Sequence, residues 1–122
     1  MRALVVDDSR TMRTIIGRIL KQLEFDVVEA GDGREALSRL AEVGAVDLAV
    51  VDWNMPNMNG YELVCAVRAD EAYRRVRLIM CTTEADVAHV QRALEAGADE
   101  FVMKPFTPEI LNQKLARLGI TR

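Results

Sequence analysis

The chain has 122 residues and a formal net charge of −3, and 50% of its residues are hydrophobic. A chain of this length buries roughly two-thirds of its unfolded surface, so we expect one domain over residues 1–122. The acidic balance argues against nucleic-acid binding, which needs clustered lysine and arginine. No apolar stretch approaches the roughly 20 residues that span a bilayer, and the N-terminus lacks a signal-peptide pattern. With two cysteines and no disulfide framework, the composition predicts a cytoplasmic protein without nucleic-acid or membrane partners.

Five short apolar runs alternate with five longer amphipathic segments along the chain. The runs have the length of strands and are mostly continuous, which is typical of strands covered on both faces. The expected strands are Ala3–Val6, Phe25–Val28, Leu48–Val51, Leu78–Cys81 and Phe101–Met103. The expected helices, each following one strand, are Met12–Leu23, Gly33–Val43, Gly60–Ala69, Glu84–Ala96 and Pro108–Leu118. Five strand–helix repeats predict parallel strands with right-handed crossovers and helices on both faces, which is a three-layer α/β sandwich.

Residues that favour helix ends agree with these boundaries. Asp32, Asn59 and Thr107 stand at the N-cap positions of three expected helices. Glu35 and Glu62 lie three residues after the first two of these caps, as in capping boxes. Glycines follow three of the helices, where a residue of positive φ is favoured, at Gly44, Gly97 and Gly119.

Polar side chains follow four of the five expected strands. They are Asp7 and Asp8 after the first strand, Asp52 after the third, Thr82 after the fourth and Lys104 after the fifth. Ligands bind beyond the carboxyl ends of the strands in an open parallel sheet, so we expect these side chains to converge at one edge. The second strand, which ends in Glu29 and Ala30, carries no candidate.

Three clustered carboxylates need a compensating charge. Two unit charges about 4 Å apart in a partly solvated site repel by about 4 kcal/mol, so a bound cation, raised pKa values or the Lys104 ammonium must offset the repulsion. Carboxylate oxygens suit Mg²⁺, and no Cys/His spacing indicates zinc. A metal ion beside a lysine and a hydroxyl is suited to phosphoryl chemistry, in which one carboxylate can become an aspartyl phosphate.

Each of these residues also has a simpler interpretation when it is taken singly. Asp7 and Asp8 fit the N-terminal end of the first helix, where negative charge complements the macrodipole. Thr82 fits a cap of the fourth helix, and Lys104 fits an ordinary surface cation. Their common placement at strand ends is what favours a functional site.

Four spaced motifs resemble the receiver domain of two-component response regulators, and the single-domain chemotaxis regulators of the CheY type most of all. They are Asp7-Asp8, the segment VVDWNMPNMNG at 50–60, Thr82, and the segment FVMKPF at 101–106. The resemblance covers essentially the whole chain. It implies a flavodoxin-like (βα)5 fold with a five-stranded parallel sheet in the order 2-1-3-4-5.

The resemblance also implies roles for the site residues. Asp52 would accept a phosphoryl group from the phosphohistidine of a sensor histidine kinase or of its phosphotransfer domain. The ligands of Mg²⁺, for which Mn²⁺ would substitute, would be Asp7, Asp8, Asp52 and the backbone carbonyl of Asn54. Lys104 would pair with a phosphoryl oxygen, and the Thr82 hydroxyl would contact the phosphoryl group after activation.

An activation switch is implied as well. Inward movement of Thr82 would vacate space for Phe101, and the face formed by the fourth helix, fifth strand and fifth helix would change for a downstream target protein. Phe101 stands where many members carry Tyr, so its ring has no hydroxyl. The Lys104–Pro105 peptide would be cis. Thr83, where many members have Ala or Gly, would narrow access to the site, and Asn54 and Glu84 match positions that tune dephosphorylation.

We therefore expect a monomeric regulator that acts alone by protein contact, with chemotaxis as one output, and that catalyses only its own phosphorylation and dephosphorylation. The receiver domain of a larger DNA-binding regulator is the first alternative. A haloacid-dehalogenase-type phosphatase is a second, although it needs an acid where Asn54 stands. A flavodoxin-like cofactor binder would need an uncharged phosphate loop in place of Asp7 and Asp8, and a receiver-like protein that is never phosphorylated would not need the complete set of polar residues.

Overall fold

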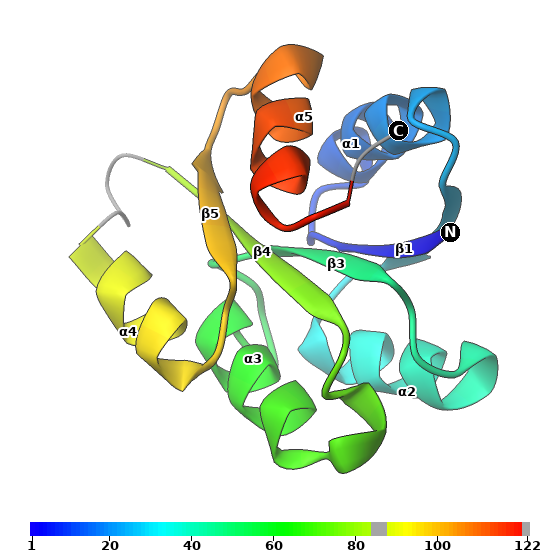
Figure 1. The fold of residues 1–122 in the computed structure, drawn as a ribbon. Helices are drawn as coiled ribbons and strands as arrows, with labels where there is room; N and C mark the ends of the chain where they lie inside the picture. Colours follow the sequence, from blue (N-terminus) through cyan, green and yellow to red (C-terminus); the bar gives the residue numbers. More distant parts are fainter. Residues whose placement is uncertain (84–87, 121–122) are drawn as a thin grey trace.

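The computed structural model describes residues 1–83 and 88–120, which form a five-stranded parallel sheet between two layers of helices (Figure 1). The strands are β1 (Arg2–Val6), β2 (Asp26–Ala30), β3 (Leu48–Asp52), β4 (Arg77–Thr82) and β5 (Glu100–Met103). They pair in the order β2-β1-β3-β4-β5, and every pair is parallel. The expected three-layer α/β fold and the implied strand order are both confirmed.

Helices α1 and α5 cover one face of the sheet, and α2, α3 and α4 cover the other (Figure 1). Their bounds are α1 (Arg10–Gln22), α2 (Gly33–Val43), α3 (Gly60–Ala69), α4 (Val90–Ala96) and α5 (Pro108–Arg117), and a short 3-10 turn, η1, spans Glu71–Tyr73. In the described part of the chain, no helix is both long enough and apolar enough to cross a membrane.

Two hydrophobic cores fill the spaces between the sheet and the helical layers. Successive strand residues point to opposite faces, so Leu4 and Val6 of β1 belong to the core under α2, α3 and α4, whereas Ala3 and Val5 belong to the core under α1 and α5. All five residues of the central strand β3 are buried, because helices cover both of its faces. This two-sided burial explains why the strands have continuous rather than alternating apolar sequences.

Side-chain caps fix the starts of the helices. Asn59 accepts from the Glu62 amide, and the Glu62 side chain accepts from the Asn59 amide, which completes the predicted capping box of α3. Asp32 caps α2 as predicted, but the Glu35 carboxylate accepts from the Gly31 amide instead of the cap residue, so this pair is not a full capping box.

Several predicted boundaries differ from the structure, among them those of the second strand and of the fourth helix. The second strand begins at Asp26 rather than at the buried Phe25, because this edge strand has exposed polar residues that apolarity cannot mark. The fourth helix was expected from Glu84, which lies outside the described residues, and α4 begins at Val90 with His89 at its N-cap position. Thr82 is the last residue of β4, so it is not the cap of α4.

Candidate functional site

The carboxyl ends of β1 and β3 bring three aspartates together. The two strands are neighbours with Val6 opposite Val51, so Asp7 and Asp52, the next residues along the chain, are also adjacent. One carboxylate oxygen from each of Asp7, Asp8 and Asp52 lies within 4.8 Å of the others. Asp7 and Asp52 are buried, and Asp8 is exposed. The expected convergence of the three side chains is thus confirmed.

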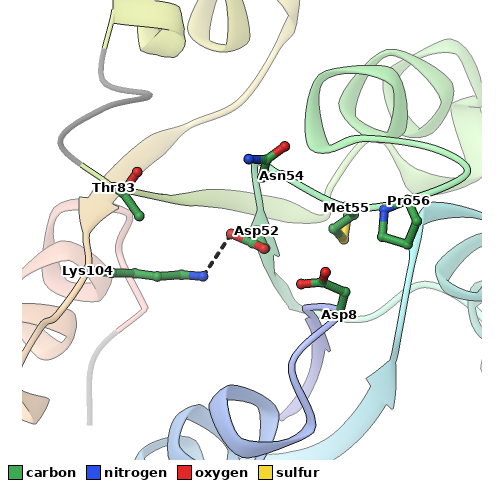
Figure 2. A pocket seen from close by; sticks show the side chains of 7 residues that line it. All are labelled: Asp8, Asp52, Asn54, Met55, Pro56, Thr83 and Lys104. Carbon is green, nitrogen blue, oxygen red and sulfur yellow. Dashed lines mark hydrogen bonds and ion pairs between the residues drawn. The ribbon is translucent and has the colours of Figure 1, made fainter.

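Lys104 reaches this cluster from the end of β5. Its ammonium donates to Oδ1 of Asp52 at 2.8 Å (Figure 2). It also donates to Oδ2 of Asp7 at 2.9 Å. The Lys104 amide donates to the Thr82 carbonyl at 2.7 Å, and the Lys104–Pro105 peptide is cis, as the resemblance implied. Lys104 is therefore a bridging cation of the site and not an isolated surface charge.

Burial and charge act in opposite directions on the two partners of this ion pair. Burial raises the pKa of Asp52 more than the hydrogen bond and charge of Lys104 lower it, and the negative charges of Asp7 and Asp8 add to the rise. Burial tends to lower the pKa of Lys104, but the hydrogen bonds and charges of Asp52 and Asp7 outweigh burial, and the net pKa is raised. Lys104 is therefore firmly protonated beside a carboxylate whose negative charge is only partly compensated.

The cluster opens into a pocket of about 610 Å³. Its lining consists of Asp8, Asp52, Asn54, Met55, Pro56, Thr83 and Lys104 (Figure 2). Met55 and Pro56 were not among the residues predicted from the sequence. They follow Asn54 directly in the loop after β3 and lie within the 50–60 segment that carries the family resemblance, which is the signal by which they could have been found.

The donor atoms of the site fit a hard divalent cation. The clustered side-chain donors are carboxylate oxygens, and Asn54 lies on the same pocket. The single ammonium of Lys104 offsets only part of the charge of three carboxylates. Oxygen ligands and excess negative charge are what Mg²⁺ prefers.

The last residue of β4, Thr82, and the residue that follows it, Thr83, differ in exposure. The Thr82 side chain is buried, at 2% exposed, and its hydroxyl donates to the Thr83 carbonyl at 3.2 Å. Thr83 is the exposed residue that lines the pocket. Phe101 is half-buried on β5, where it pairs with Met80 of β4, and the Lys114 ammonium lies 4.8 Å from the centre of its ring.

The loop between β3 and α3 folds closely over the end of β3. The Gly60 amide donates to the Trp53 carbonyl at 3.0 Å, and a Cβ atom at Gly60 would lie 2.6 Å from the Asp52 carbonyl oxygen. Glycine is therefore needed there for the loop to pack against Asp52. The ring of Trp53 stacks on His89 at a centroid distance of 5.2 Å and contacts Tyr61 at 6.3 Å.

The end of β2, where no candidate was expected, is not empty. Glu29 accepts a hydrogen bond at 3.2 Å from Arg13 of α1, which also donates to the Asp7 carbonyl. Helical spacing alone does not predict this contact, because it depends on how α1 lies against the ends of β1 and β2. Glu84, which was also predicted as a site residue, lies outside the described residues.

Comparison with known proteins finds the same family that the sequence motifs resemble. The sequence profile of the response regulator receiver domain matches residues 3–116. The chain is 47% identical over 116 residues to the chemotaxis protein CheY1 of Helicobacter pylori, covering 94% of each chain. It is 49% identical over 116 residues to a chemotaxis protein CheY homolog of Campylobacter jejuni, covering 94% of this chain and 89% of the relative.

Solved structures of related proteins have the same fold as this chain. The chemotaxis protein CheY4 of Vibrio cholerae superposes with a TM-score of 0.87 at 37% identity, covering 95% of this chain and 96% of that one. The receiver domain of a sensor histidine kinase of Pseudomonas aeruginosa, with a magnesium ion coordinated in its active-site cleft, superposes with a TM-score of 0.84 at 32% identity, covering 95% and 94%. Because the matching profile and relatives span nearly the whole chain and agree with the fold, this chain belongs to the response regulator receiver domain family, in which it is similar to chemotaxis proteins of the CheY type.

Proposed function

We propose that this chain is a CheY-type response regulator of two-component signalling, in which Asp52 accepts a phosphoryl group from a histidine kinase or from its phosphotransfer domain. The observation that carries the proposal is the convergence of three aspartates and Lys104 at the carboxyl ends of the strands, where Asp8, Asp52 and Lys104 line one pocket. The relatives named as chemotaxis proteins support chemotaxis as the process that the chain serves.

Asp52 acts as the nucleophile. A carboxylate oxygen attacks the phosphorus of phosphohistidine, a P–O bond forms, and the P–N bond breaks as the imidazole leaves with its electron pair and then takes up a proton. The hydrogen bond from Lys104 at 2.8 Å orients the Asp52 carboxylate at the pocket and supports this role.

Mg²⁺, or Mn²⁺ in its place, would be held by Asp7, Asp8, Asp52 and the Asn54 carbonyl. Bound there, the ion would supply positive charge against the phosphoryl oxygens and the carboxylates. The amide of Ser9 donates to Oδ1 of Asp7 at 2.9 Å and Lys104 holds Oδ2, so Asp7 is already fixed in place. Asp8 is exposed on the pocket, where it can meet an ion from solvent.

Lys104 and Thr82 answer the charge that phosphorylation adds. A phosphorylated side chain carries about −1.5 to −2 charges at neutral pH. Lys104 would pair with a phosphoryl oxygen through a charge-assisted hydrogen bond. Thr82 would exchange its present bond to the Thr83 carbonyl for a stronger bond to the phosphoryl group.

Movement of Thr82 would then be transmitted to the surface on which a target protein docks. Thr82 and Phe101 lie on the paired strands β4 and β5. As Thr82 moves inward, Phe101 would turn into the vacated space, leave its contact with Lys114, and change the face formed by α4, β5 and α5. Thr83, which lines the pocket, would restrict access to Asp52. Asn54 and Glu84 would influence the rate of dephosphorylation.

We also propose that residues 1–122 form one receiver domain that acts as a monomer and catalyses only its own phosphorylation and dephosphorylation. Cys65 and Cys81 are both free thiols, which agrees with a cytoplasmic location. The family match does not favour a haloacid-dehalogenase-type phosphatase. Absence of turnover of p-nitrophenyl phosphate is the expected result for the purified protein.

Incubation with acetyl phosphate and Mg²⁺, followed by intact mass, tests the proposal. The expected result is a gain of one phosphoryl group that hydroxylamine removes, as an acyl phosphate requires. Asp52→Asn should abolish the gain, and the matched control Asp26→Asn, an exposed aspartate of β2, should retain it. A stable adduct in Asp52→Asn, or none in the natural chain, would contradict the assignment of Asp52.

A further inference from the structure

Arg13 of α1 links the end of β1 to the end of β2. Its Nη1 donates to the backbone carbonyl of Asp7 at 2.6 Å, and its Nε donates to Oε1 of Glu29 at 3.2 Å. The Arg13 side chain is only 18% exposed. The Glu29 carbonyl in turn accepts from Nε of Arg39 of α2 at 3.2 Å, so the strand end that carries Glu29 is itself held in place.

This contact fixes the peptide that joins Asp7 to Asp8. A peptide unit is planar, so holding the carbonyl oxygen of Asp7 also fixes the direction of the Asp8 amide and restricts the backbone from which the Asp8 side chain projects. The Asp7 amide donates to the Ala30 carbonyl at 3.1 Å. The turn that carries Asp7 and Asp8 is therefore attached to β2 in two ways. The Asp7 amide bonds directly to Ala30 of β2, and the Asp7 carbonyl is linked to Glu29 of β2 through Arg13.

The charges of this arrangement point to orientation as the role of Arg13. A bare guanidinium close to three carboxylates would compete electrostatically with a divalent cation. Glu29 pairs with Arg13 and offsets that charge. The planar fork of arginine can donate to two acceptors at once in a fixed geometry, which the ammonium of lysine cannot reproduce.

We propose that Arg13 is a positioning residue for the divalent-cation site, and that Glu29 acts through Arg13. The inference rests on the cation site of the proposed function and adds a second layer of residues behind it. Partners that orient metal ligands typically change metal affinity by about 10- to 100-fold when they are removed.

Titration of the metal-free protein with MgCl₂, followed by the fluorescence of Trp53, the single tryptophan, measures the dissociation constant. Arg13→Met should raise the Kd for Mg²⁺ by about tenfold. Arg13→Lys should raise it less than Arg13→Met without restoring the original value, because it keeps the charge and loses the fork. The control Arg18→Met, an exposed arginine of the same helix, should leave the Kd unchanged.

Urea unfolding in EDTA separates positioning from general stability. A purely structural role predicts a lower unfolding midpoint in Arg13→Met with an unchanged Kd in the folded protein, and that outcome would overturn the proposal. So would an Arg13→Lys variant with the original Kd. If Arg13→Met does not fold, Arg13→Lys and Glu29→Gln still carry the test.

The double variant tests the part assigned to Glu29. Glu29→Gln should raise the Kd in the natural background, and should add no further rise in the Arg13→Met background if Glu29 acts through Arg13. Equal rises in both backgrounds would mean that Glu29 acts on the ion by its own charge, against the proposal. Failure of the unchanged protein to bind Mg²⁺ would instead overturn the proposed function and this inference together.

Discussion

The ammonium of Lys104 lies 2.8 Å from Oδ1 of Asp52, although the two residues are 52 positions apart in the chain. The contact arises because β3 and β5 flank β4 in a parallel sheet, so the carboxyl ends of both strands lie on the same side of the molecule. This ion pair joins Asp52, the proposed phosphate acceptor, to Lys104, whose ammonium is proposed to bind a phosphoryl oxygen.

Removal of Lys104 should have opposite effects on stability and on metal binding. In Lys104→Met the carboxylates of Asp7 and Asp52 lose a cation that both contact, so the free energy of unfolding in EDTA should fall by about 2 kcal/mol. The Kd for Mg²⁺ should fall as well, because the ammonium no longer competes for these oxygens. Urea unfolding and fluorescence titration measure the two effects, with the exposed Lys21→Met as control. Weaker Mg²⁺ binding in Lys104→Met would contradict the prediction.

Neutralising Asp8 should stabilise the metal-free protein and abolish its affinity for Mg²⁺. Asp8 is exposed, and its carboxylate lies within 4.8 Å of those of Asp7 and Asp52, so it adds repulsion in the absence of metal. We expect Asp8→Asn to raise the free energy of unfolding in EDTA by about 1 kcal/mol, a gain typical when charge at a functional site is removed. Asp26→Asn, also exposed, should change neither quantity. A less stable Asp8→Asn protein would show that repulsion is not the dominant effect.

Glu100 should make stability depend on pH in the acidic range. Burial raises the pKa of Glu100, but a hydrogen bond from the Phe101 amide, the charge of Lys114 and the side-chain hydrogen bonds from Arg117 and Lys114 outweigh burial and leave the net pKa lowered. The folded chain therefore binds this proton less readily than the unfolded chain. The stabilisation is present above the ordinary glutamate pKa of about 4.3 and is lost as the pH falls through the lower value in the folded state.

Comparison of Glu100→Gln with the natural chain checks this pH dependence. The difference in free energy of unfolding should be largest near neutral pH and should shrink as the solution is acidified below about pH 4. Glu42→Gln, with a side chain 62% exposed and a surface pair to Arg39, should show little such trend. A difference that stays constant with pH would show that packing and not charge is responsible.

Arg68 should be critical for stability at the amino-terminal ends of β4 and β5, which lie at the opposite end of the strands from the pocket. From α3 it donates to the Gly97 carbonyl at 2.8 Å, to the Val76 carbonyl at 2.7 Å and to the Asp99 carboxylate at 2.9 Å. Arg68→Met should lower the free energy of unfolding by about 2–3 kcal/mol, because these acceptors lose a half-buried partner. Arg68→Lys should recover little, since an ammonium lacks the fork.

Urea unfolding measures these losses, with the exposed Arg75→Met as control. The Kd for Mg²⁺ of the folded variants should stay unchanged, because the starts of β4 and β5 lie at the far end of the strands from Asp52. A shift of the Kd in Arg68→Met would reveal coupling across the sheet that the contacts do not predict.

The sequence predicts the elements well where burial is two-sided or where a cap is present. The bounds expected for α2 and α3 agree with the structure, since Asp32 and Asn59 cap them, and β3 was found because all of its residues are apolar until Asp52. β2 was misplaced by one to two residues, because an edge strand with exposed residues at Asp26 and Glu29 has no continuous apolar run.

Local patterns in this chain determined which residues face the core and which polar residues stand at strand ends, and hence the α/β fold and the set of aspartates with Lys104. Those patterns depend only on side-chain periodicity and capping, which act between near neighbours. Tertiary structure alone decided that the Thr82 side chain is buried and does not line the pocket, and that Arg13 bridges Asp7 and Glu29. Such contacts depend on strand register and on the path of loops, which bring together residues far apart in the chain and leave no periodic trace in it.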